Sequence, residues 1–214
     1  MELYTYFRSS AAYRVRIALN LKGLQADYRY VHLVKDGGQH HKPEFLQLNP
    51  QGLVPVLVDD GNVLTQSLAI IEYLEETHLN PPLLPKNPVA RARVRALAQI
   101  VACEIHPVNN LRILKYLEKE FGIDEIGRKQ WYRHWVIEGF EALEKLLASS
   151  PETGKFCHGD QPTLADLCLV PQVFNARRFE VDMSRFPAIA RIDAACLALD
   201  AFSAAAPERQ ADVG

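Results

Sequence analysis

Two adjacent serines, Ser9 and Ser10, stand where a short strand is expected to pass into a helix. The apolar residues that follow recur at roughly helical spacing up to Gly23, which suits a helix stop. Either serine suits the N-cap position, and the free amides and dipole of a helix start favour a bound anion. A serine hydroxyl there could donate a hydrogen bond to a thiolate and lower its pKa. The pattern fits an anion site, although an ordinary helix cap has the same pattern.

A second helix start of this kind comes at Gln66 and Ser67, directly after an expected hairpin turn. Ser67 can serve as the N-cap, so this helix start is also predicted to face an anion. The strand before the hairpin begins at Pro55, where a missing N–H costs least. From the sequence alone, a cis bond between Val54 and Pro55 has a prior of roughly 5%.

The elements that position these residues predict an N-terminal domain over residues 1–80. Strand, helix, strand, helix, strand, hairpin strand and helix follow one another there, which is the order of a compact α/β unit with a mixed sheet. The second strand is expected at 28–33. A proline-rich run over 80–88 then interrupts all periodicity and marks the best domain boundary.

The residues from 88 to 214 have a helical pattern throughout and predict a second, all-helical domain. The first long helix is expected to be kinked at Pro107. Thr163 and Asp166 have the spacing of a capping pair, so we assign Asp166 to helix capping rather than to catalysis. The expected helices cover residues 89–120, 124–148, 163–179 and 186–199.

Composition and charge restrict the function further. The chain has 214 residues, 48% of them hydrophobic, and a formal net charge of −2, which gives no reason to expect nucleic acid as a partner. No apolar run approaches the ~20 residues needed to cross a membrane, and the N-terminus does not resemble a signal peptide. We therefore expect a cytoplasmic protein without membrane contact. The four cysteines lie far apart, so we expect reduced, mostly buried thiols and no metal site.

The motifs, taken in order, resemble the zeta class of the glutathione transferases. The resemblance covers nearly the whole chain, because matching motifs occur in both domains at matching spacing. It implies a glutathione transferase fold, with a thioredoxin-like domain over 1–80 and a helical-bundle domain over 88–214. The motifs are Ser9-Ser10 with Tyr13-Arg14-Val15-Arg16-Ile17-Ala18-Leu19, Leu48-Asn49-Pro50-Gln51-Gly52, Gln66-Ser67-Leu68-Ala69-Ile70-Ile71, Ile105-His106-Pro107, Thr163-Leu164-Ala165-Asp166 and Ala176-Arg177-Arg178-Phe179.

The resemblance implies glutathione as cofactor and gives roles to individual residues. Ser9 or Ser10 would lie beside the glutathione sulfur, and Gln66 and Ser67 would hold its γ-glutamyl carboxylate. Arginine side chains would bind the substrate carboxylate and stabilise an enolate; by similarity they are Arg8, Arg112 and Arg178. The other implied glutathione-binding residues are Gln51, Val54, a cis Pro55, His106 and Asn110.

Several of these residues have plainer interpretations. Arg8 could simply pair with an acid, and Arg112 could be a solvated helix charge. One residue of the Arg177-Arg178 pair is expected to form a surface salt bridge. His106 could be a core histidine. Where many zeta-class members have a cysteine after the two serines, this chain has Ala11, which removes the nucleophile for mixed-disulfide chemistry.

The implied activity is glutathione-dependent cis–trans isomerisation of maleylacetoacetate or maleylpyruvate, anionic diketo-acids of aromatic and tyrosine catabolism. Thiolate addition would make the double bond rotatable, and elimination would release the fumaryl isomer. The alternatives are a general glutathione transferase or dehalogenase, and a non-catalytic binding or scaffold protein on the same fold. The resemblance also implies a homodimer. Pocket shape, which the sequence does not give, would select between the two substrates.

Overall fold

The computed structural model describes residues 1–213 and divides the chain into two units. One unit contains Met1–Pro82 together with the C-terminal residues from Ala198 onward, and the other contains Leu83–Leu197. The expected second domain, 88–214, differs from this division in its last residues. Those residues belong with the N-terminal unit because of contacts made by its first helix, described below.

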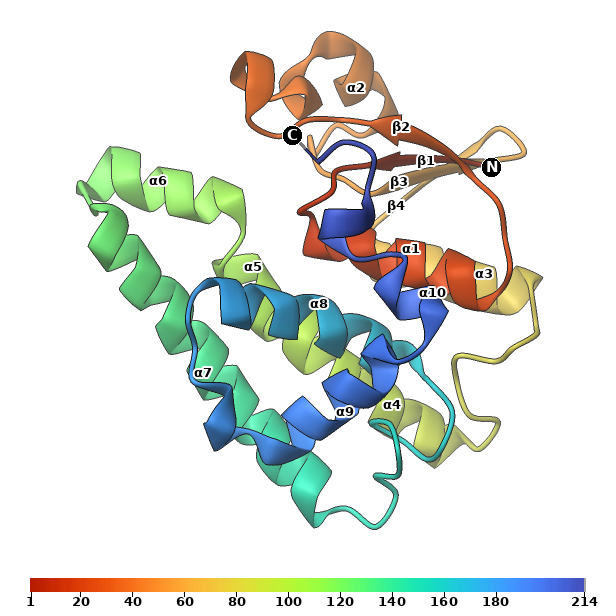
Figure 1. Cartoon of the computed structure of the whole chain (residues 1–214). Coiled ribbons are helices and arrows are strands. Elements are labelled where there is room, and N and C mark those ends of the chain that lie inside the picture. Colours follow the sequence, from red (N-terminus) through yellow and green to blue (C-terminus); the bar gives the residue numbers. More distant parts are fainter. Residues whose placement is uncertain (214) are drawn as a thin grey trace. The chain divides into compact units, whose positions relative to one another are not determined.

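The N-terminal unit is built on a four-stranded mixed sheet with strand order β2-β1-β3-β4 (Figure 1). Strand β1 pairs parallel with β2 and antiparallel with β3, and β4 closes the hairpin with β3. The predicted mixed α/β unit is therefore confirmed. Its strands are β1 (Glu2–Thr5), β2 (Asp27–Tyr30), β3 (Val56–Asp59) and β4 (Asn62–Thr65), and its longer helices are α1 (Ser10–Leu21), α2 (Pro43–Leu48) and α3 (Ser67–Thr77).

Strand β2 is shorter than the expected 28–33. Val31 still donates its amide to the carbonyl oxygen of Thr5, but the amide of His32 donates instead to the side chain of Gln39 at 2.9 Å. The side chain of Gln39 thus holds the backbone just beyond the end of the strand.

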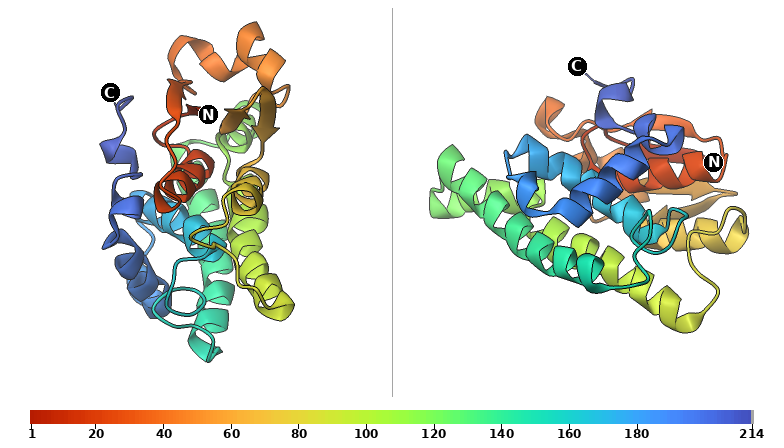
Figure 2. Two further views of the ribbon diagram at one scale, coloured as in Figure 1. Left: turned by 90° about the vertical axis from the view of Figure 1, so that its right-hand side faces the viewer. Right: turned by 60° about the horizontal axis from the view of Figure 1, so that its bottom comes forward.

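The two faces of the sheet are covered by different helices. Helices α1 and α3 pack against each other on one face, and α2 lies on the other (Figures 1 and 2). Because side chains alternate along a strand, Leu3 and Leu57 are buried on the α1 side, whereas Tyr6 and Val56 join Phe45 of α2 in a second cluster. Apolar burial on both faces holds the strand ends that carry the site.

The C-terminal residues are tied to α1 by three hydrogen bonds. The hydroxyl of Tyr13 donates to the carbonyl oxygen of Phe202 at 3.2 Å, and Nε of Arg16 donates to that of Ala205 at 3.0 Å. The side chain of Asn20 donates to the carbonyl oxygen of Ala201 at 2.9 Å. Ala201 lies in the short helix α10 (Asp200–Ser203), which these bonds hold against α1. Because the bonded residues lie far apart in the sequence, its helical pattern did not show that the C-terminal residues belong to the N-terminal unit.

The second unit is helical, as predicted, and α8 runs through its centre. Nearly every residue of α8 from Leu164 to Ala176 is buried, and the helix packs against α4 and α9. The helices of this unit are α4 (Pro88–Gln99), α5 (His106–Val108), α6 (Leu111–Phe121), α7 (Glu125–Ser149), α8 (Leu164–Arg178) and α9 (Pro187–Leu197), with a π-helical segment at Ile100–Ile105.

Asp166 caps the start of α8, as predicted. Its carboxylate accepts hydrogen bonds from the backbone amides of Cys157 and Thr163, at 2.8 and 2.7 Å, and from the Thr163 hydroxyl at 2.9 Å. The side chain is 0% exposed, and burial raises its pKa. The group therefore connects a loop to a helix start in the interior of the unit, away from solvent.

The expected long helix with a kink at Pro107 is wrong. The helical course ends after α5, and α6 begins as a separate helix with Asn110 as its N-cap. Asn110 has extended backbone angles, φ −62° and ψ 146°, and its side chain accepts the amide of Arg112 at 3.1 Å. An extended residue cannot lie inside a helix, so the chain has two separate helices here instead of one kinked helix.

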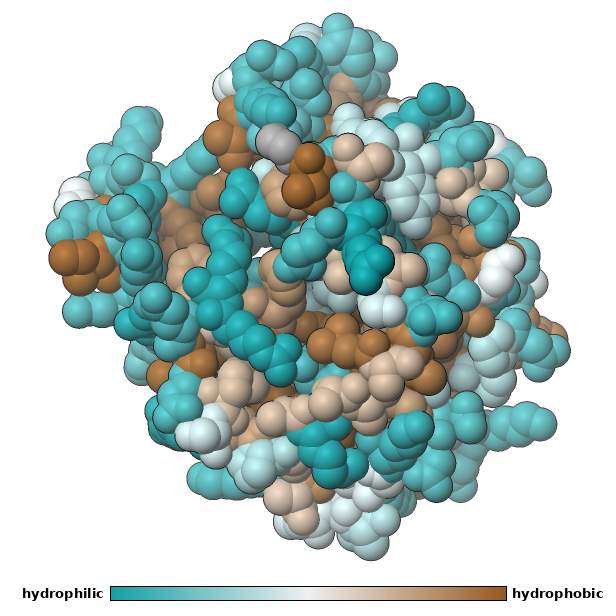
Figure 3. Space-filling model, viewed as in Figure 1, coloured by the Kyte–Doolittle hydropathy of each residue, from teal (hydrophilic) through white to brown (hydrophobic). Residues whose placement is uncertain are grey.

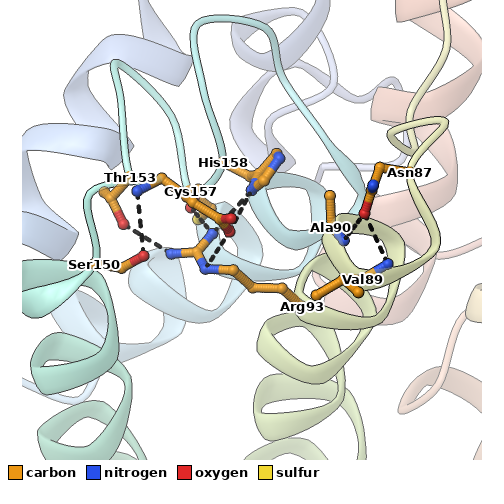
Figure 4. A network of polar contacts seen from close by, with 9 residues as sticks. Asn87, Val89, Ala90, Arg93, Ser150, Thr153, Cys157 and His158 are labelled. Carbon is orange, nitrogen blue, oxygen red and sulfur yellow. Dashed lines mark hydrogen bonds and ion pairs between the residues drawn. The ribbon is translucent and has the colours of Figure 1, made fainter.

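Arg93 of α4 holds the loop between α7 and α8 (Figure 4). Its guanidinium donates to the carbonyl oxygen of Cys157 at 2.8 Å and to the Thr153 hydroxyl at 2.9 Å, and it lies 3.2 Å from Nδ1 of His158. Asn87 caps the same helix by accepting two backbone amides. These bonds account for an ordered loop that has few apolar residues.

Helix α6 has no buried residue, and exposed apolar side chains occur there and at the start of α7, among them Tyr116, Phe121 and Ile126. Hydrophilic residues predominate on the face seen in Figure 3, with hydrophobic residues scattered among them. Within residues 1–213, no helix is both long and apolar enough to span a membrane.

Tyr132 of α7 provides a pH-dependent test of the helical core. Its ring stacks on Phe179 with centroids 3.6 Å apart, and burial raises its pKa to about 12, against smaller opposing effects of Gln172 and Arg178. Because the native state holds the phenolic proton more tightly than the unfolded chain, this contribution to stability is complete below pH ~10 and is lost as the pH rises to about 12.

We compare the free energies of unfolding of the wild type and Tyr132→Phe. The wild-type value minus the variant value is expected to fall by about 2–3 kcal/mol between pH ~9 and ~12. Urea unfolding at both pH values measures it. A difference between the two proteins that does not change with pH would contradict the assignment, because the other tyrosines are common to both.

Candidate active site

The structure distinguishes between the two serines at the start of α1. Ser9 is the N-cap, with extended backbone angles, and its Oγ accepts the amide of Ala12 at 3.2 Å. Ser10 is the first residue of the helix and is buried. Since the cap bond uses a lone pair of the Ser9 oxygen, the hydroxyl hydrogen of Ser9 remains available to an anion at the helix start. Ser9 is thus the better placed donor.

Arg8 lies on the same turn and is exposed. Its guanidinium donates to the Tyr6 hydroxyl at 3.1 Å and lies over the ring of Phe7, 5.0 Å from the centroid. Within residues 1–213 Arg8 contacts these two aromatic side chains and no acid. The plainer interpretation, that Arg8 simply pairs with an acid, is therefore not met among these residues. Its charge is therefore not neutralised within the described chain.

Gln51 and Gln66, which are 15 residues apart in the sequence, lie together in the N-terminal unit. The amide of Gln66 donates to Oε1 of Gln51 at 2.8 Å. Asn49 holds the intervening turn by donating to the carbonyl oxygen of Leu53 at 2.8 Å and accepting the amide of Gln51 at 3.1 Å. The bond between Val54 and Pro55 is cis, as the resemblance implied.

Helix α3 begins directly beside these amides. The prediction that Ser67 is the N-cap is wrong, because Gln66 holds that position with φ 67° and Ser67 is already the first helical residue. Gln66 itself provides no side-chain cap. The Oγ of Ser67 accepts a hydrogen bond from Nη1 of Arg14 at 3.2 Å. The first-turn amides of α3 therefore have no side-chain cap, and an uncapped helix start of this kind favours an anion.

The remaining candidate residues belong to the helical unit. His106 begins α5 and is half-buried, and Asn110 caps α6, where it positions the exposed Arg112 in the first turn. Arg178 is exposed in the last turn of α8, with its guanidinium 5.1 Å from the ring centroid of Phe179. Arg112 and Arg178 thus place two cations at the ends of two helices.

The adjacent Arg177 forms the salt bridge expected of one residue of the pair, but its partner is buried and not on the surface as predicted. Its guanidinium lies 2.6 Å from a carboxylate oxygen of Asp193, whose side chain is buried. The salt bridge engages Arg177, and the zeta-class resemblance implied Arg178 for ligand binding.

Three of the four cysteines are buried, and two of these are unsuited to nucleophilic chemistry. Cys157, Cys168 and Cys196 are buried, as expected, and Cys103 is exposed. Burial raises the pKa of Cys157 and of Cys196, and the nearby carboxylate of Asp166 raises both further. Among the described residues, no group of three or more His, Cys, Asp or Glu side chains could hold a metal ion.

Two family models match the chain, the glutathione S-transferase N-terminal domain over residues 3–82 and the glutathione S-transferase C-terminal domain over 130–207. The chain belongs to the glutathione S-transferase family. Within this family it is similar to the maleylpyruvate isomerase of Ralstonia sp, with 54% identity over 99% of each chain. It is also 53% identical to the maleylacetoacetate isomerase of Rhizobium meliloti, over 97% of this chain and 96% of the relative.

Solved structures agree with this assignment. A holo maleylpyruvate isomerase, described as a zeta-class bacterial glutathione S-transferase, has a TM-score of 0.97 at 53% identity over 100% of both chains. The maleylacetoacetate isomerase of Anaeromyxobacter dehalogenans, with bound dicarboxyethyl glutathione and citrate in its active site, has a TM-score of 0.85 at 43% identity. That comparison covers 100% of this chain and 97% of the other. The predicted glutathione transferase fold and zeta-class resemblance are confirmed.

Two residues that support the site were not singled out from the sequence. Asn49 orders the turn that carries Gln51, and Arg14 contacts Ser67 from α1. Asn49 lies before Pro50 in a turn-forming run, which is a local signal for such a role. Arg14 has no local signal, because its partner lies 53 residues away in the sequence.

Proposed function

We propose that this glutathione S-transferase is a glutathione-dependent isomerase that converts maleylacetoacetate or maleylpyruvate to the fumaryl isomer. Two observations together carry the proposal. About half of the residues, over nearly the whole chain, are identical to those of relatives named for these two reactions, and a serine is the N-cap at the start of α1. Family membership alone is compatible with many substrates.

The residues of the N-terminal unit fit glutathione. The tripeptide is an anion with a γ-glutamyl carboxylate, and the α3 start offers free amides and the Ser67 hydroxyl to such a group. Gln51 and Gln66 provide further amide groups beside that helix start. Val54, before the cis Pro55, is suited to pair its backbone with the peptide like an added strand. His106 and Asn110 are the proposed contacts from the helical unit.

Bound glutathione supplies the thiolate, which makes the cis double bond of the substrate rotatable by reversible addition. The chain has to keep that sulfur ionised. Ser9 can donate its hydroxyl hydrogen to the sulfur while its oxygen caps α1, and the helix dipole adds to the effect. Ala11 does not interfere with this function, because no protein thiol takes part.

Negative charge also has to be bound on the substrate. A diketo-acid carries a carboxylate, and its carbonyl oxygen gains charge in the transition state. Arg8, Arg112 and Arg178 offer planar cationic donors that suit both groups. The relative that binds dicarboxyethyl glutathione supports this choice, since that ligand carries two carboxylates on the group attached to glutathione.

The purified protein, mixed with maleylpyruvate or maleylacetoacetate, is expected to accelerate formation of the fumaryl product at least about a thousandfold over glutathione alone. The loss of substrate ultraviolet absorbance and the product itself are measured with and without glutathione. The ratio of the two rates identifies the natural substrate. Glutathione binding without turnover of either compound would contradict the proposal and favour a general transferase or dehalogenase.

The same preparation tests the non-catalytic alternative. A scaffold protein would have no need to keep the Ser9 cap or the Gln66 and Ser67 helix start, so we expect the chain to be retained on immobilised glutathione. Elution by free glutathione is the measurement, and failure to be retained would favour the scaffold function.

We propose further that the protein works as a cytoplasmic homodimer. The support is its resemblance to a class whose members are usually dimers, together with a composition without membrane or nucleic-acid features. Light scattering after size exclusion is expected to give twice the 24.1 kDa mass of the chain. A monomeric mass at working concentration would contradict the dimer.

A further inference from the structure

Arg14 is a buried cation whose hydrogen-bonding capacity is largely unused. The residue is 2% exposed and lies in the middle of α1. Nη1 donates to the hydroxyl oxygen of Ser67 at 3.2 Å, but Nε and Nη2 are buried without a hydrogen-bond partner in the described chain. A buried guanidinium with unpaired donors lowers the stability of the protein.

A second arginine on the same helix provides a direct comparison. Arg16 is 0% exposed, and its guanidinium donates to four oxygen atoms, namely those of the Ala205, Tyr6 and Phe7 carbonyls and the Thr5 hydroxyl. Arg16 therefore has the bonds that a structural buried arginine needs, and Arg14 does not. A buried residue that lowers stability in this way is retained mainly where it contributes to the function of the protein.

The direction of the bond between Arg14 and Ser67 matters. A guanidinium has only donors, so the Ser67 oxygen is the acceptor, and the Ser67 hydrogen has to point elsewhere. Ser67 is the first residue of α3, whose first-turn amides carry no side-chain cap. Arg14 thus orients a hydroxyl donor at a helix start and adds a full positive charge behind it.

We propose that Arg14 is a positioning residue for glutathione, acting through Ser67 on the α-carboxylate of the γ-glutamyl group. The inference rests on the proposed function only in taking glutathione as the ligand. In the low-dielectric interior, the charge of Arg14 strengthens the hydrogen bond from Ser67 to a carboxylate more than it would in water.

The test compares glutathione with 4-aminobutyryl-cysteinyl-glycine, which lacks only that carboxylate. Isothermal titration calorimetry gives both dissociation constants for the wild type, Arg14→Met and Arg14→Lys. We expect Arg14→Met to weaken glutathione binding about 10- to 100-fold and to change binding of the analogue less than about threefold. Arg14→Lys keeps the charge and is expected to recover part of the loss.

Apo stability gives a second, independent readout. Because Arg14 is poorly paired, the melting temperature of apo Arg14→Met is expected to be equal to or above that of the wild type, and the rise caused by saturating glutathione is expected to be reduced. The matched control is Arg16→Lys. It loses several bonds of a well-paired guanidinium, so its apo melting temperature is expected to fall while the affinity ratio between the two ligands stays at the wild-type value.

An equal loss of affinity for both ligands in Arg14→Met would overturn the proposal, since the effect would then not depend on the carboxylate. A change in oligomeric state with unchanged glutathione affinity would also overturn it, by placing Arg14 at an interface. These failures can be separated from failure of the isomerase proposal. A wild type that binds glutathione through Arg14 but turns over neither substrate would leave this inference standing.

Discussion

Ser9→Ala is expected to lower kcat/KM for glutathione-dependent isomerisation by about 10²- to 10³-fold, the usual effect of removing one donor from a developing or bound anion. The physical reason is the availability of the Ser9 hydroxyl hydrogen at the start of α1, where the Ser9 oxygen accepts the Ala12 amide at 3.2 Å. Without that donor the bound thiol ionises less readily. The pH profile of kcat/KM should therefore move to higher pH by about 1–2 pH units.

Two further variants separate this effect from loss of the helix cap. Ser9→Gly also removes the hydroxyl but retains most of the capping stability, so its activity should fall as far as that of Ser9→Ala while its stability stays near that of the wild type. Ser10→Ala changes a buried residue inside the helix and should cost less than about tenfold. Full activity in Ser9→Ala with a large loss in Ser10→Ala would assign the sulfur contact to Ser10 instead.

Asp166→Ala is expected to lower the free energy of unfolding by about 3–5 kcal/mol, the largest effect on stability that we predict for a single side chain. Two backbone amides and the Thr163 hydroxyl would lose their acceptor in an interior that water does not reach. The cost of the variant is mainly these unpaired donors. Urea unfolding followed by circular dichroism measures the difference.

Asp124→Ala is the matched control for a cap that is exposed. Asp124 accepts the Gly127 amide at 2.8 Å at the start of α7, so its loss should cost only about 1 kcal/mol. Similar costs for the two variants would contradict the role of burial. Below its melting temperature, Asp166→Ala should retain glutathione affinity, because Asp166 contacts none of the residues proposed to bind the ligand.

Local patterns predicted the parts of the molecule that depend on neighbouring residues. The Thr163 and Asp166 spacing predicted a capping box, because both partners lie within one helical turn. The paired strands and helices of residues 1–80 were predicted from short periodic runs and turn residues. At Pro107 the same approach was wrong, because the extended Asn110 starts a new helix where the apolar spacing continues without a break.

The two serines mark the limit of such patterns. Both carry the same hydroxyl group, and only the backbone angles at Ser9 make it the cap and leave Ser10 inside the helix. The same limit applied to the salt bridge expected of either Arg177 or Arg178, which the buried carboxylate of Asp193 forms with Arg177. In each case the chemistry of the residue was known and its surroundings were not.

The strand and helix order of residues 1–80, a helix start at the two adjacent serines and another near Ser67, the capping role of Asp166 and the family resemblance all follow from residue types and short spacings. Folding alone brought Arg14 to Ser67, Gln51 to Gln66 and the C-terminal residues to α1. The physical reason is that a hydrogen bond depends on distance and orientation in space. Residues 15, 53 or 189 positions apart leave no periodic trace of such a bond in the sequence.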